Sequence, residues 1–562
     1  MRKLPCVLTL FTSAAFGQNP LYLNNLGGAA YDMGNGVLAG PNNEHFYTGA
    51  FSGAADLAPN ASGGTVTSAG GRDIYFTKYT SDGAFVWGKA IGGASSDEGI
   101  AMVSSNDNGL ILTGTYTFEA DMDPGPGITN LHVAGSNTSS LGTFLSRYTS
   151  NGDLVWAKSL SGINAGCYVT DMARDVTGNI YLTGWYTGPV DFDPSANDLI
   201  FLNNLNSNAF VAKYDANGNL LWARQIGGSA MTWAYSIYVT GSGTVLVGGF
   251  YDSGTCDMDP GTAAVERTAA NGVRNGWAVK LTTGGQYDWS VDLAGDGACT
   301  VKTVLLDGSG NAFLGGIFEG TYDLDPGPGV ISTISDDSED AFLMKLSGTN
   351  GALFQVVPFQ GFFDEDVSLM TLGSDGSLYF SGATWGDSDL DPGPGIVYPL
   401  VELPVFFCHY STSLDYLGHY GWSDLGNIVH KSMDVDIDER MISTGRFDGT
   451  IDLNTGNGSY PLTAVGEQDG FIICIGDINV GFAQPVRSTD LGAFPNPSHG
   501  LFHLELPYPD MAVSVSDGSG RVLFQTSIMK SSILDLSSQP AGTYVINAWN
   551  EKFSQAQKVV LE

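Results

Sequence analysis

The chain has 562 residues and a formal charge of −36 at pH 7, from 59 acidic and 23 basic side chains. Nucleic acids and anionic membranes would be repelled by this charge, which argues against both as partners. With 43% apolar residues the chain can bury a core, and its 76 glycines suit short strands joined by tight turns. Composition therefore predicts a soluble, acidic, extracellular all-β protein.

The N-terminal segment has the three parts of a secretory signal peptide. Arg2 and Lys3 precede an apolar run from Leu4 to Phe16, and small residues precede Gln18. Cys6 lies before the apolar run, which argues against a lipoprotein anchor. We expect residues 1–17 to direct export to the periplasm. No later apolar run is long enough to predict a membrane span.

An acidic turn recurs along the chain at intervals of 63 to 70 residues and defines seven units. Each unit predicts four short strands, such as "NIYLTGWYTG" (179–188) and a hairpin, "AFVAKYDANGNLLWARQIGG" (209–228). Four-stranded units in this number predict a seven-bladed β-propeller over residues 18–482, with a linear solenoid as the competing architecture. The first aspartates of the seven turns are Asp56, Asp121, Asp191, Asp257, Asp323, Asp389 and Asp452.

The two ends of this region favour a closed ring. The seventh unit has its third strand, from Asp469, but no fourth strand with the usual Trp and Gly-Gly. At the opposite end, "PLYLNNLGG" (20–28) places Tyr22 and Gly27-Gly28 with the spacing of Trp222 and Gly227-Gly228. We therefore predict that the N-terminal strand completes the last blade and removes a sheet edge.

The repeated hairpin carries a recognisable pattern, seen at Asp73, Phe76, Lys78 and Trp87. In this pattern the units resemble the bacterial β-propeller repeats known as SBBP repeats, from about Pro20 to Phe482. The resemblance implies a fold and no activity. The sixth and seventh units depart from it, with His409 and Cys474 where Lys or Arg usually stands.

Several residue types recur with the units, and we interpret them as structural. The fourth-strand aromatics should pack between neighbouring sheets, the third-strand cations should pair with local acids, and most cysteines should be buried. The fourth-strand aromatics are Trp87, Trp156, Trp222, Trp289 and Phe354. The third-strand cations are Lys78, Arg147, Lys213, Lys280 and Lys345. The cysteines are Cys167, Cys256, Cys299, Cys408 and Cys474.

The acidic turns, written "ADMDPGPG" at 120–127, allow two interpretations. Asp at i and i+2 of an extended segment point the same way, and such oxygen-rich loops suit Ca²⁺. Alternatively, each Asp accepts a hydrogen bond from a backbone N–H two residues on, and Pro fixes the turn. We favour hydrogen bonding, with calcium as the alternative. The candidate ligands are Asp121, Asp123, Asp191, Asp193, Asp257, Asp259, Asp323, Asp325, Asp389 and Asp391.

Other acidic residues should lie on the same rim as these turns. In a propeller, the loop between the second and third strands shares a face with the connection to the next blade. The connections carry Asp97, Glu98, Asp364, Glu365, Asp366 and Asp424. We therefore expect one acidic rim.

A search for catalytic patterns finds no G-x-S-x-G, no H-E-x-x-H and no P-loop. His409, His419 and His430 are too widely spaced for a metal motif. A glycosidase could use two carboxylates, but the abundance of acids identifies no particular pair. We predict no catalytic residue and no cofactor other than the Ca²⁺ alternative.

After a linker at 483–492, residues 493–562 alternate as a small β-sandwich should. They resemble the type A sorting domain of the type IX secretion system of Bacteroidota. This resemblance implies export across the outer membrane by the type IX machinery, followed by release or surface attachment. The matching residues are Pro495, Asn496, Pro497, Gly500, Asp517, Gly520, Arg521, Pro540, Gly542, Thr543, Tyr544, Lys558, Val559 and Val560.

Together these observations predict a secreted or cell-surface β-propeller that is monomeric and not an enzyme. It would bind an extracellular glycan or protein, as an adhesin or scaffold. The alternative function is an extracellular hydrolase that acts on polysaccharide.

Overall fold

The computed structural model describes residues 20–135, 141–195, 201–202, 206–335, 338–361, 364–384, 388–391, 403–422, 427–453, 460–477, 492–494, 501–505, 511–518, 520–528, 532–550 and 553–561. The predicted signal peptide lies outside them. Every secondary-structure element among the described residues is a β-strand, so the predicted all-β class is confirmed. The chain divides into two compact units, with β1 to β36 in the first and β37 to β43 in the second.

The first unit contains seven antiparallel sets of four strands among the described residues. The first three sets are β2 (Met33–Ala39), β3 (His45–Asp56), β4 (Thr65–Tyr79) and β5 (Phe85–Ile91); β6 (Glu98–Ser104), β7 (Leu110–Thr117), β10 (Leu141–Tyr148) and β11 (Leu154–Leu160); and β12 (Gly166–Arg174), β13 (Ile180–Thr187), β16 (Asn208–Tyr214) and β17 (Leu220–Gly228).

The remaining sets follow the same order along the chain. They are β18 (Met231–Val239), β19 (Val245–Asp257), β20 (Glu266–Leu281) and β21 (Tyr287–Leu293); β22 (Ala298–Leu306), β23 (Ala312–Glu319), β26 (Asp340–Leu346) and β27 (Leu353–Phe359); β28 (Asp366–Leu372), β29 (Leu378–Thr384), β30 (Leu403–Tyr410) and β31 (Tyr416–Trp422); and β32 (Ile428–Val435), β33 (Arg440–Phe447) and β36 (Asp469–Asp477), with β1 (Pro20–Gly28) as the fourth strand.

Short strand pairs flank four of the acidic turns. They are β8 (Glu119–Asp121) with β9 (Asn130–His132), β14 (Val190–Asp191) with β15 (Phe201–Leu202), β24 (Thr321–Asp323) with β25 (Ser332–Ile334), and β34 (Thr450–Asp452) with β35 (Pro461–Thr463). In the first and fourth sets the long strands β3–β4 and β19–β20 supply the same pairing themselves.

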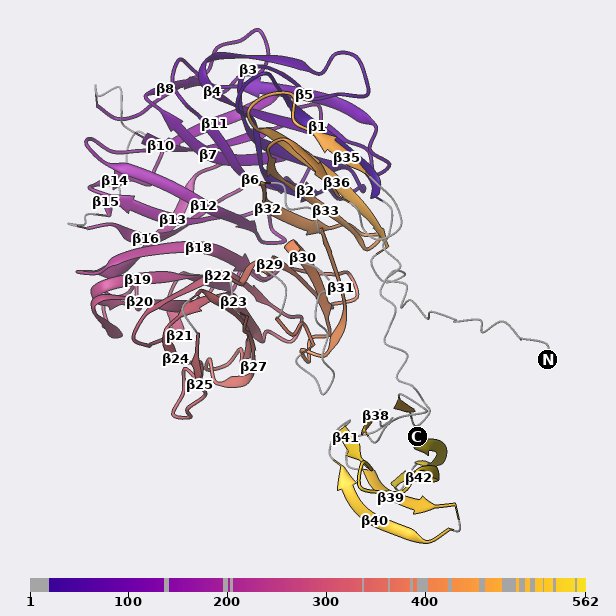
Figure 1. Ribbon diagram of the computed structural model, residues 1–562. Helices are drawn as coiled ribbons and strands as arrows, with labels where there is room; N and C mark the ends of the chain where they lie inside the picture. Colours follow the sequence, from indigo (N-terminus) through magenta and orange to yellow (C-terminus); the bar gives the residue numbers. More distant parts are fainter. Residues whose placement is uncertain are drawn as a thin grey trace. The chain divides into compact units, whose positions relative to one another are not determined.

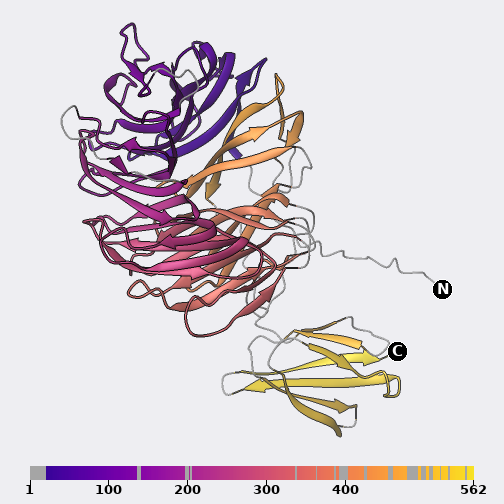
Figure 2. The same ribbon diagram turned by 90° about the vertical axis from the view of Figure 1, so that its left-hand side faces the viewer.

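Neighbouring sets pack through their first strands. Contacts run in order from β2 through β6, β12, β18, β22 and β28 to β32, and β32 in turn contacts β2. Figure 1 and Figure 2 show the sheets following one another in chain order, with strands from the two ends of this unit close together. This arrangement of antiparallel sheets is compatible with a β-propeller.

The predicted pairing of the N-terminal strand with the last set is confirmed. β1 runs antiparallel to β36, with Leu23 opposite Ile473 and Leu26 opposite Gly470. Leu26 and Ile473 are almost fully buried. Segments separated by more than 440 residues thus share one sheet, and the strand missing from the last unit comes from the start of the chain.

Each fourth-strand Trp packs on a glycine in the third hairpin of the next set. A Cβ on Gly285 would lie 2.9 Å from the Trp222 ring, and one on Gly152 would lie 3.2 Å from Trp87. The indole N–H of Trp222 also donates to Thr283 O at 3.3 Å. Tyr22 repeats this contact at the chain ends, since a Cβ on Gly83 would lie 2.4 Å from its ring. The predicted packing between sheets is confirmed for these aromatics, but Phe354, in the fifth set, is 60% exposed.

The third-strand cations pair with local acids, as predicted. Nitrogen–oxygen distances run from 2.8 Å in Arg147–Asp107 to 3.9 Å in Lys345–Asp307. Lys78, Lys213 and Lys280 pair in the same way with Glu44, Asp175 and Asp288. Cys167, Cys256, Cys299, Cys408 and Cys474 are buried free thiols, also as predicted.

The second unit consists of two small sheets. One pairs β37 (Gly492–Phe494), β38 (Leu501–Glu505) and β41 (Ser532–Asp535); the other pairs β40 (Val522–Ile528), β39 (Met511–Asp517), β42 (Gly542–Asn550) and β43 (Phe553–Leu561). Phe502 and Leu534 from the first sheet share a core with Val515 and Ile546 from the second. Two antiparallel sheets around one core form a sandwich of the predicted kind.

Candidate functional site

The acidic turns hold their own loops together. Asp121 Oδ1 accepts hydrogen bonds from the backbone N–H of Asp123 at 3.0 Å and of Thr129 at 2.8 Å, and Asp123 Oδ1 accepts one from Gly125 at 2.8 Å. The turns at Asp257 and Asp323 repeat all three bonds. At the turn of Asp191, two of these bonds recur: Asp191 Oδ1 accepts one from the Asp193 N–H, and Asp193 Oδ1 accepts one from the Ser195 N–H. These carboxylates therefore stabilise their turns by accepting hydrogen bonds from backbone N–H groups, and so act as turn caps.

The residue between the two aspartates fixes the turn to the core. Met122, Phe192, Met258, Leu324 and Leu390 occupy this position, and each is fully buried. Tyrosine hydroxyl groups from third strands donate to the same backbone: Tyr148 to Met122 O at 3.1 Å, Tyr214 to Phe192 O at 2.8 Å, and Tyr410 to Leu390 O. Asp389 and Asp391 flank the buried Leu390 in the same way.

The acidic turn also binds the preceding set through its backbone. Gly92, at the end of the first set, and Asp121 exchange N–H···O bonds of 3.1 and 2.8 Å. Gly227 pairs with Asp257 and Gly27 with Asp56 in equivalent positions. A Cβ on Gly93 would lie 2.1 Å from Glu119 O, which explains the second glycine of the repeated Gly-Gly. The turn recurs because each sheet uses it to hold the sheet before it.

The predicted acidic rim needs a correction at two connections. Asp97 and Glu365 are almost fully buried. Asp97 accepts hydrogen bonds from the N–H groups of Gly93 at 2.8 Å and Thr117 at 2.9 Å. Burial raises its pKa to about 7, although both hydrogen bonds lower it. The carboxylate points inward because it caps the connection, and Asp424 lies outside the described residues.

Calcium binding by the acidic turns stays a prediction. Across the part of the chain that the structure describes, no group of three or more His, Cys, Asp or Glu side chains is placed to hold a metal ion. Two aspartates per turn supply fewer oxygens than Ca²⁺ takes, so a bound ion would need backbone carbonyls and water as well.

The three histidines of the sixth and seventh units have separate partners. His409 Nε2 lies 2.7 Å from Ser377 Oγ, and His419 Nδ1 lies 2.6 Å from Tyr416 Oη. His430 Nδ1 lies 2.9 Å from Ser381 Oγ. Burial lowers the pKa of His409 to about 4 and that of His430 to about 3. Each of these histidines thus has a different hydrogen-bond partner.

Sequence reasoning missed a buried polar chain where the two ends of the first unit meet. His45 Nε2 lies 3.1 Å from Asp436 Oδ2, and both side chains are fully buried. Tyr22 Oη lies 2.6 Å from His45 Nδ1 and 2.6 Å from Tyr47 Oη. Burial alone would raise the pKa of Asp436, but hydrogen bonds from His45 and from backbone N–H groups lower it. This chain joins the first set to the last.

The signal for this chain was present in the sequence. In the third set the aspartate of the first hairpin, Asp175, pairs with Lys213 of the same set, at 3.7 Å. The seventh set has Cys474 in place of that lysine. Asp436 therefore takes its partner, His45, from the first set.

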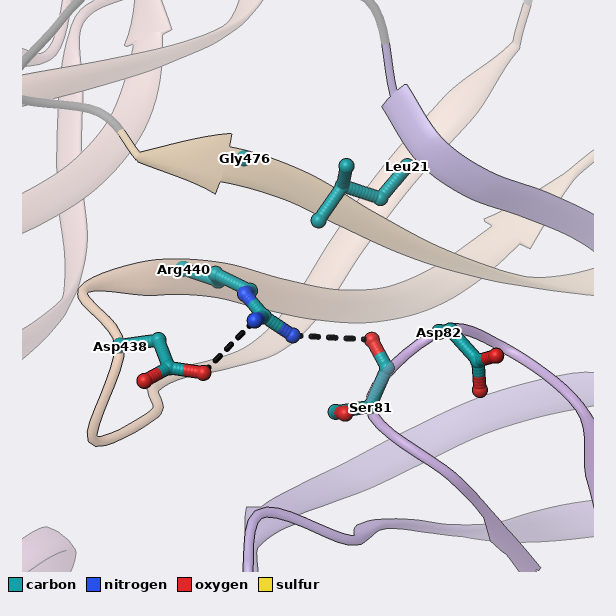
Figure 3. A pocket seen from close by; sticks show the side chains of 6 residues that line it. All are labelled: Leu21, Ser81, Asp82, Asp438, Arg440 and Gly476. Atoms are coloured by element: carbon teal, nitrogen blue, oxygen red, sulfur yellow. Dashed lines mark hydrogen bonds and ion pairs between the residues drawn. The ribbon is translucent and has the colours of Figure 1, made fainter.

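A shallow hollow lies on the outside of the same junction (Figure 3). Its lining comes from both ends of the unit: Leu21, Ser81, Asp82, Asp438, Arg440 and Gly476. Arg440 joins the two ends, since it donates to Ser81 O at 3.2 Å and forms an ion pair of 2.6 Å with Asp438 (Figure 3). The pKa of Asp82 is lowered, first by its hydrogen bond from Thr80.

The predicted sorting residues are only partly described. Pro495, Asn496, Pro497 and Gly500 lie outside the described residues. Gly542 begins β42, and Tyr544 on the same strand is buried and donates its hydroxyl to Pro540 O at 2.5 Å. Lys558 on β43 is exposed.

Residues 492–562 match the family described as "Secretion system C-terminal sorting domain" (Por_Secre_tail). This domain marks the chain as a protein that the type IX secretion system exports to the cell surface or the extracellular space. The type IX machinery is therefore a partner of the chain during export. Among the described residues, no helix is long and apolar enough to cross a membrane.

Comparisons over the rest of the chain show weaker likenesses. An uncharacterized WD repeat-containing protein, L264 of Acanthamoeba polyphaga mimivirus, is 26% identical over 190 residues, which cover 30% of this chain and 14% of that protein. A protein of unknown function from Bacteroides caccae is similar at 10% identity and a TM-score of 0.25, over 58% of this chain and 94% of its own.

PorZ, an essential bacterial surface component of the type IX secretion system of Porphyromonas gingivalis, is similar at 10% identity and a TM-score of 0.15, over 96% of this chain and 100% of its own. TM-scores this low carry no argument about this protein.

Proposed function

We propose that residues 20–477 form a seven-bladed β-propeller of the SBBP-repeat type, which acts outside the cell as a binding or scaffold protein. The cyclic order of contacts between first strands and the pairing of β1 with β36 support the ring. The protein would act as a monomer, because the ring pairs its own two ends and leaves only the short outer strands of its sets as edges.

The proposed binding role rests on the structural part that the repeated residues play in every set. Acidic turns, fourth-strand aromatics and third-strand cations all serve loops and contacts between sheets. The repeat thus builds a rigid platform, and recognition falls to residues that differ between sets. Rigid scaffolds that carry variable surface residues are typical of binding proteins.

The hydrolase alternative would need a carboxyl group that keeps its proton near neutral pH, beside a second carboxylate. The hollow of Figure 3 has two carboxyl groups, Asp82 and Asp438, but the pKa of Asp82 is lowered. Asp82 is also exposed, and Asp438 is paired with Arg440 at 2.6 Å, so neither carboxyl group of the hollow has the desolvated surroundings that suit a general acid, which supports binding over hydrolysis there.

The mature secreted protein, purified from culture medium or cell surfaces, tests the proposal on glycan and protein arrays with parallel detection of products. We expect saturable binding without release of fragments. Product formation that is lost in Asp438→Asn would contradict the binding role and favour the hydrolase.

A further inference from the structure

Three cationic side chains meet where the seventh, first and second sets adjoin. Lys431 and Arg446 belong to β32 and β33, and Arg72 belongs to β4. Arg72 forms an ion pair of 2.8 Å with Glu98 of β6, and its guanidinium lies 5.8 Å from the centre of the Tyr31 ring. Arg446 donates to the hydroxyl of the same Tyr31. We refer to Arg72, Lys431 and Arg446 as the cation cluster.

The cation cluster is short of negative charge, in a chain with more than twice as many acids as bases. Glu98 is the carboxylate paired with it, and within the described ranges neither Lys431 nor Arg446 has a carboxylate within 4.0 Å. Arg446 otherwise donates to Gln468 Oε1 at 3.3 Å, and its Nε is buried without a partner.

Two nearby carboxylates are occupied elsewhere. Asp32 accepts hydrogen bonds from Gly28 and Ser52, and Asp469 accepts them from Asn25 and Val465. The fold therefore brings three cations together with Glu98 as the carboxylate paired among them.

Lys431 and Arg446 are close enough to repel each other. The Lys431 side chain reaches solvent, yet surrounding protein partly desolvates it. That desolvation, and next the positive charge of Arg446, lower the pKa of Lys431. Adjacent cations of this kind cost stability unless an anion lies between them.

The repeat shows that the fold does not require these cations. Every first strand has a bulge at the same place, and Lys431 is the extra residue of β32. A bulge of this kind turns one side chain out of the regular alternation. The other six bulge residues are Asn35, Ile100, Thr170, Tyr235, Lys302 and Ser368.

Lys302 provides a direct comparison, because it forms an ion pair of 2.8 Å with Asp366. Lys431 occupies the same position in its own set and lacks such a partner among the described residues. At the position of Arg446, the other sets have Ala50, Thr115, Trp185, Phe250, Ile317 and Ala383.

We propose that the cation cluster binds a carboxylate or sulfate group carried by an otherwise neutral extracellular polysaccharide. The proposal rests on the binding function inferred above and names its ligand class. Guanidinium groups match the two oxygens of a carboxylate or sulfate, and an ammonium group supplies a further charge.

The surrounding charge narrows the class of ligand. A ligand with charges all along its length, such as an acidic peptide or a nucleic acid, would meet the repulsion of a chain with a net charge of −36. A sugar chain with isolated uronate or sulfate units can place one charge on the cluster and neutral rings over the rest of the surface.

Calorimetric titration of the mature protein with glucuronate, sulfated galactose and a hexasaccharide of alternating uronate and neutral units tests this site. We expect the hexasaccharide to bind, and binding to weaken as NaCl is added. Lys431→Met and Arg446→Gln should each weaken it by roughly tenfold, the loss of one charged hydrogen bond. Lys302→Met is the matched control and should leave it unchanged.

Three results would overturn the proposal: no heat with any of the three probes at millimolar concentration, equal weakening in Lys302→Met, or tighter binding of poly-aspartate than of the hexasaccharide. Lys431→Met removes one of two cations that repel each other, so this variant should melt at the wild-type temperature or slightly above it, which separates a lost site from a lost fold. If arrays find a neutral glycan or a protein ligand while these probes fail, the binding function stands and this site falls.

Discussion

His45→Leu should release the N-terminal strand selectively. The substitution keeps an apolar body of similar size and removes the group that contacts Asp436 at 3.1 Å. Asp436 keeps its hydrogen bonds from the N–H groups of Asp438 and Arg440, both at 2.9 Å. Loss of a hydrogen bond to a buried carboxylate costs about 1.5–3 kcal/mol, and the contact of His45 with Tyr22 Oη is lost as well, which places this case at the upper end. A loss of about 3 kcal/mol raises the population of the open state by on the order of 100-fold.

Lys213→Leu is the matched control, because Lys213 contacts the equivalent Asp175 within a single set. Urea denaturation should show that both variants are less stable than the wild type. Proteolysis under native conditions should cleave between Leu21 and Leu26 on the order of 100-fold faster in His45→Leu, since cleavage follows the open population, and within a few fold of wild type in Lys213→Leu. Equal cleavage of the two variants in this strand would refute the role of His45 in closure.

Four further outcomes follow from the structure. Asp97 keeps its proton in the folded state up to about pH 7, so its contribution to stability is present below the unfolded pKa near 4 and is lost as pH rises towards 7. Thermal melts should therefore show that Asp97→Asn lowers the stability more at pH 5 than at pH 8. An equal loss of stability at the two pH values would contradict a buried, protonated Asp97. Gly93→Ala should destabilise by about 1–3 kcal/mol, because its Cβ would lie 2.1 Å from the backbone Glu119 O, whereas Gly308→Ala has open space and should be neutral in the same denaturation assay. Calcium titration should give no heat if the aspartates act only as turn caps, and a heat that disappears in Asp121→Asn would favour the metal. Deletion of residues 492–562 should leave the chain in the periplasm on cell fractionation, and its appearance in the medium would contradict the sorting role.

The repeat made most of the fold predictable. Acidic turns at regular intervals placed the four strands of each unit, and the missing last strand pointed to β1. The same regularity identified Trp222 and its equivalents as contacts between sheets. Repeated residues indicate the architecture because every four-stranded set makes the same kinds of contact with its neighbours.

The candidate sites were harder to foresee, because they depend on residues brought together only by folding. His45 and Asp436 are 391 positions apart, and although the repeat shows that Asp436 lacks the usual lysine, it does not show that His45 takes its place. Asp97 looked like a surface acid, because a sequence does not show that backbone N–H groups will draw its carboxylate inward. The cation cluster combines residues of the first and seventh sets, and only the departure of Lys431 and Arg446 from the repeat distinguished them in the sequence.

Hydrogen exchange of the wild-type protein tests the closure of the first unit most directly. The amides of β1 between Leu23 and Leu26 that donate to β36 should be protected to the same degree as the β36 amides that donate to β1, because these hydrogen bonds form one ladder and should open together. Exchange of the β1 amides at the rate of an unstructured peptide, while β36 stays protected, would contradict the closure.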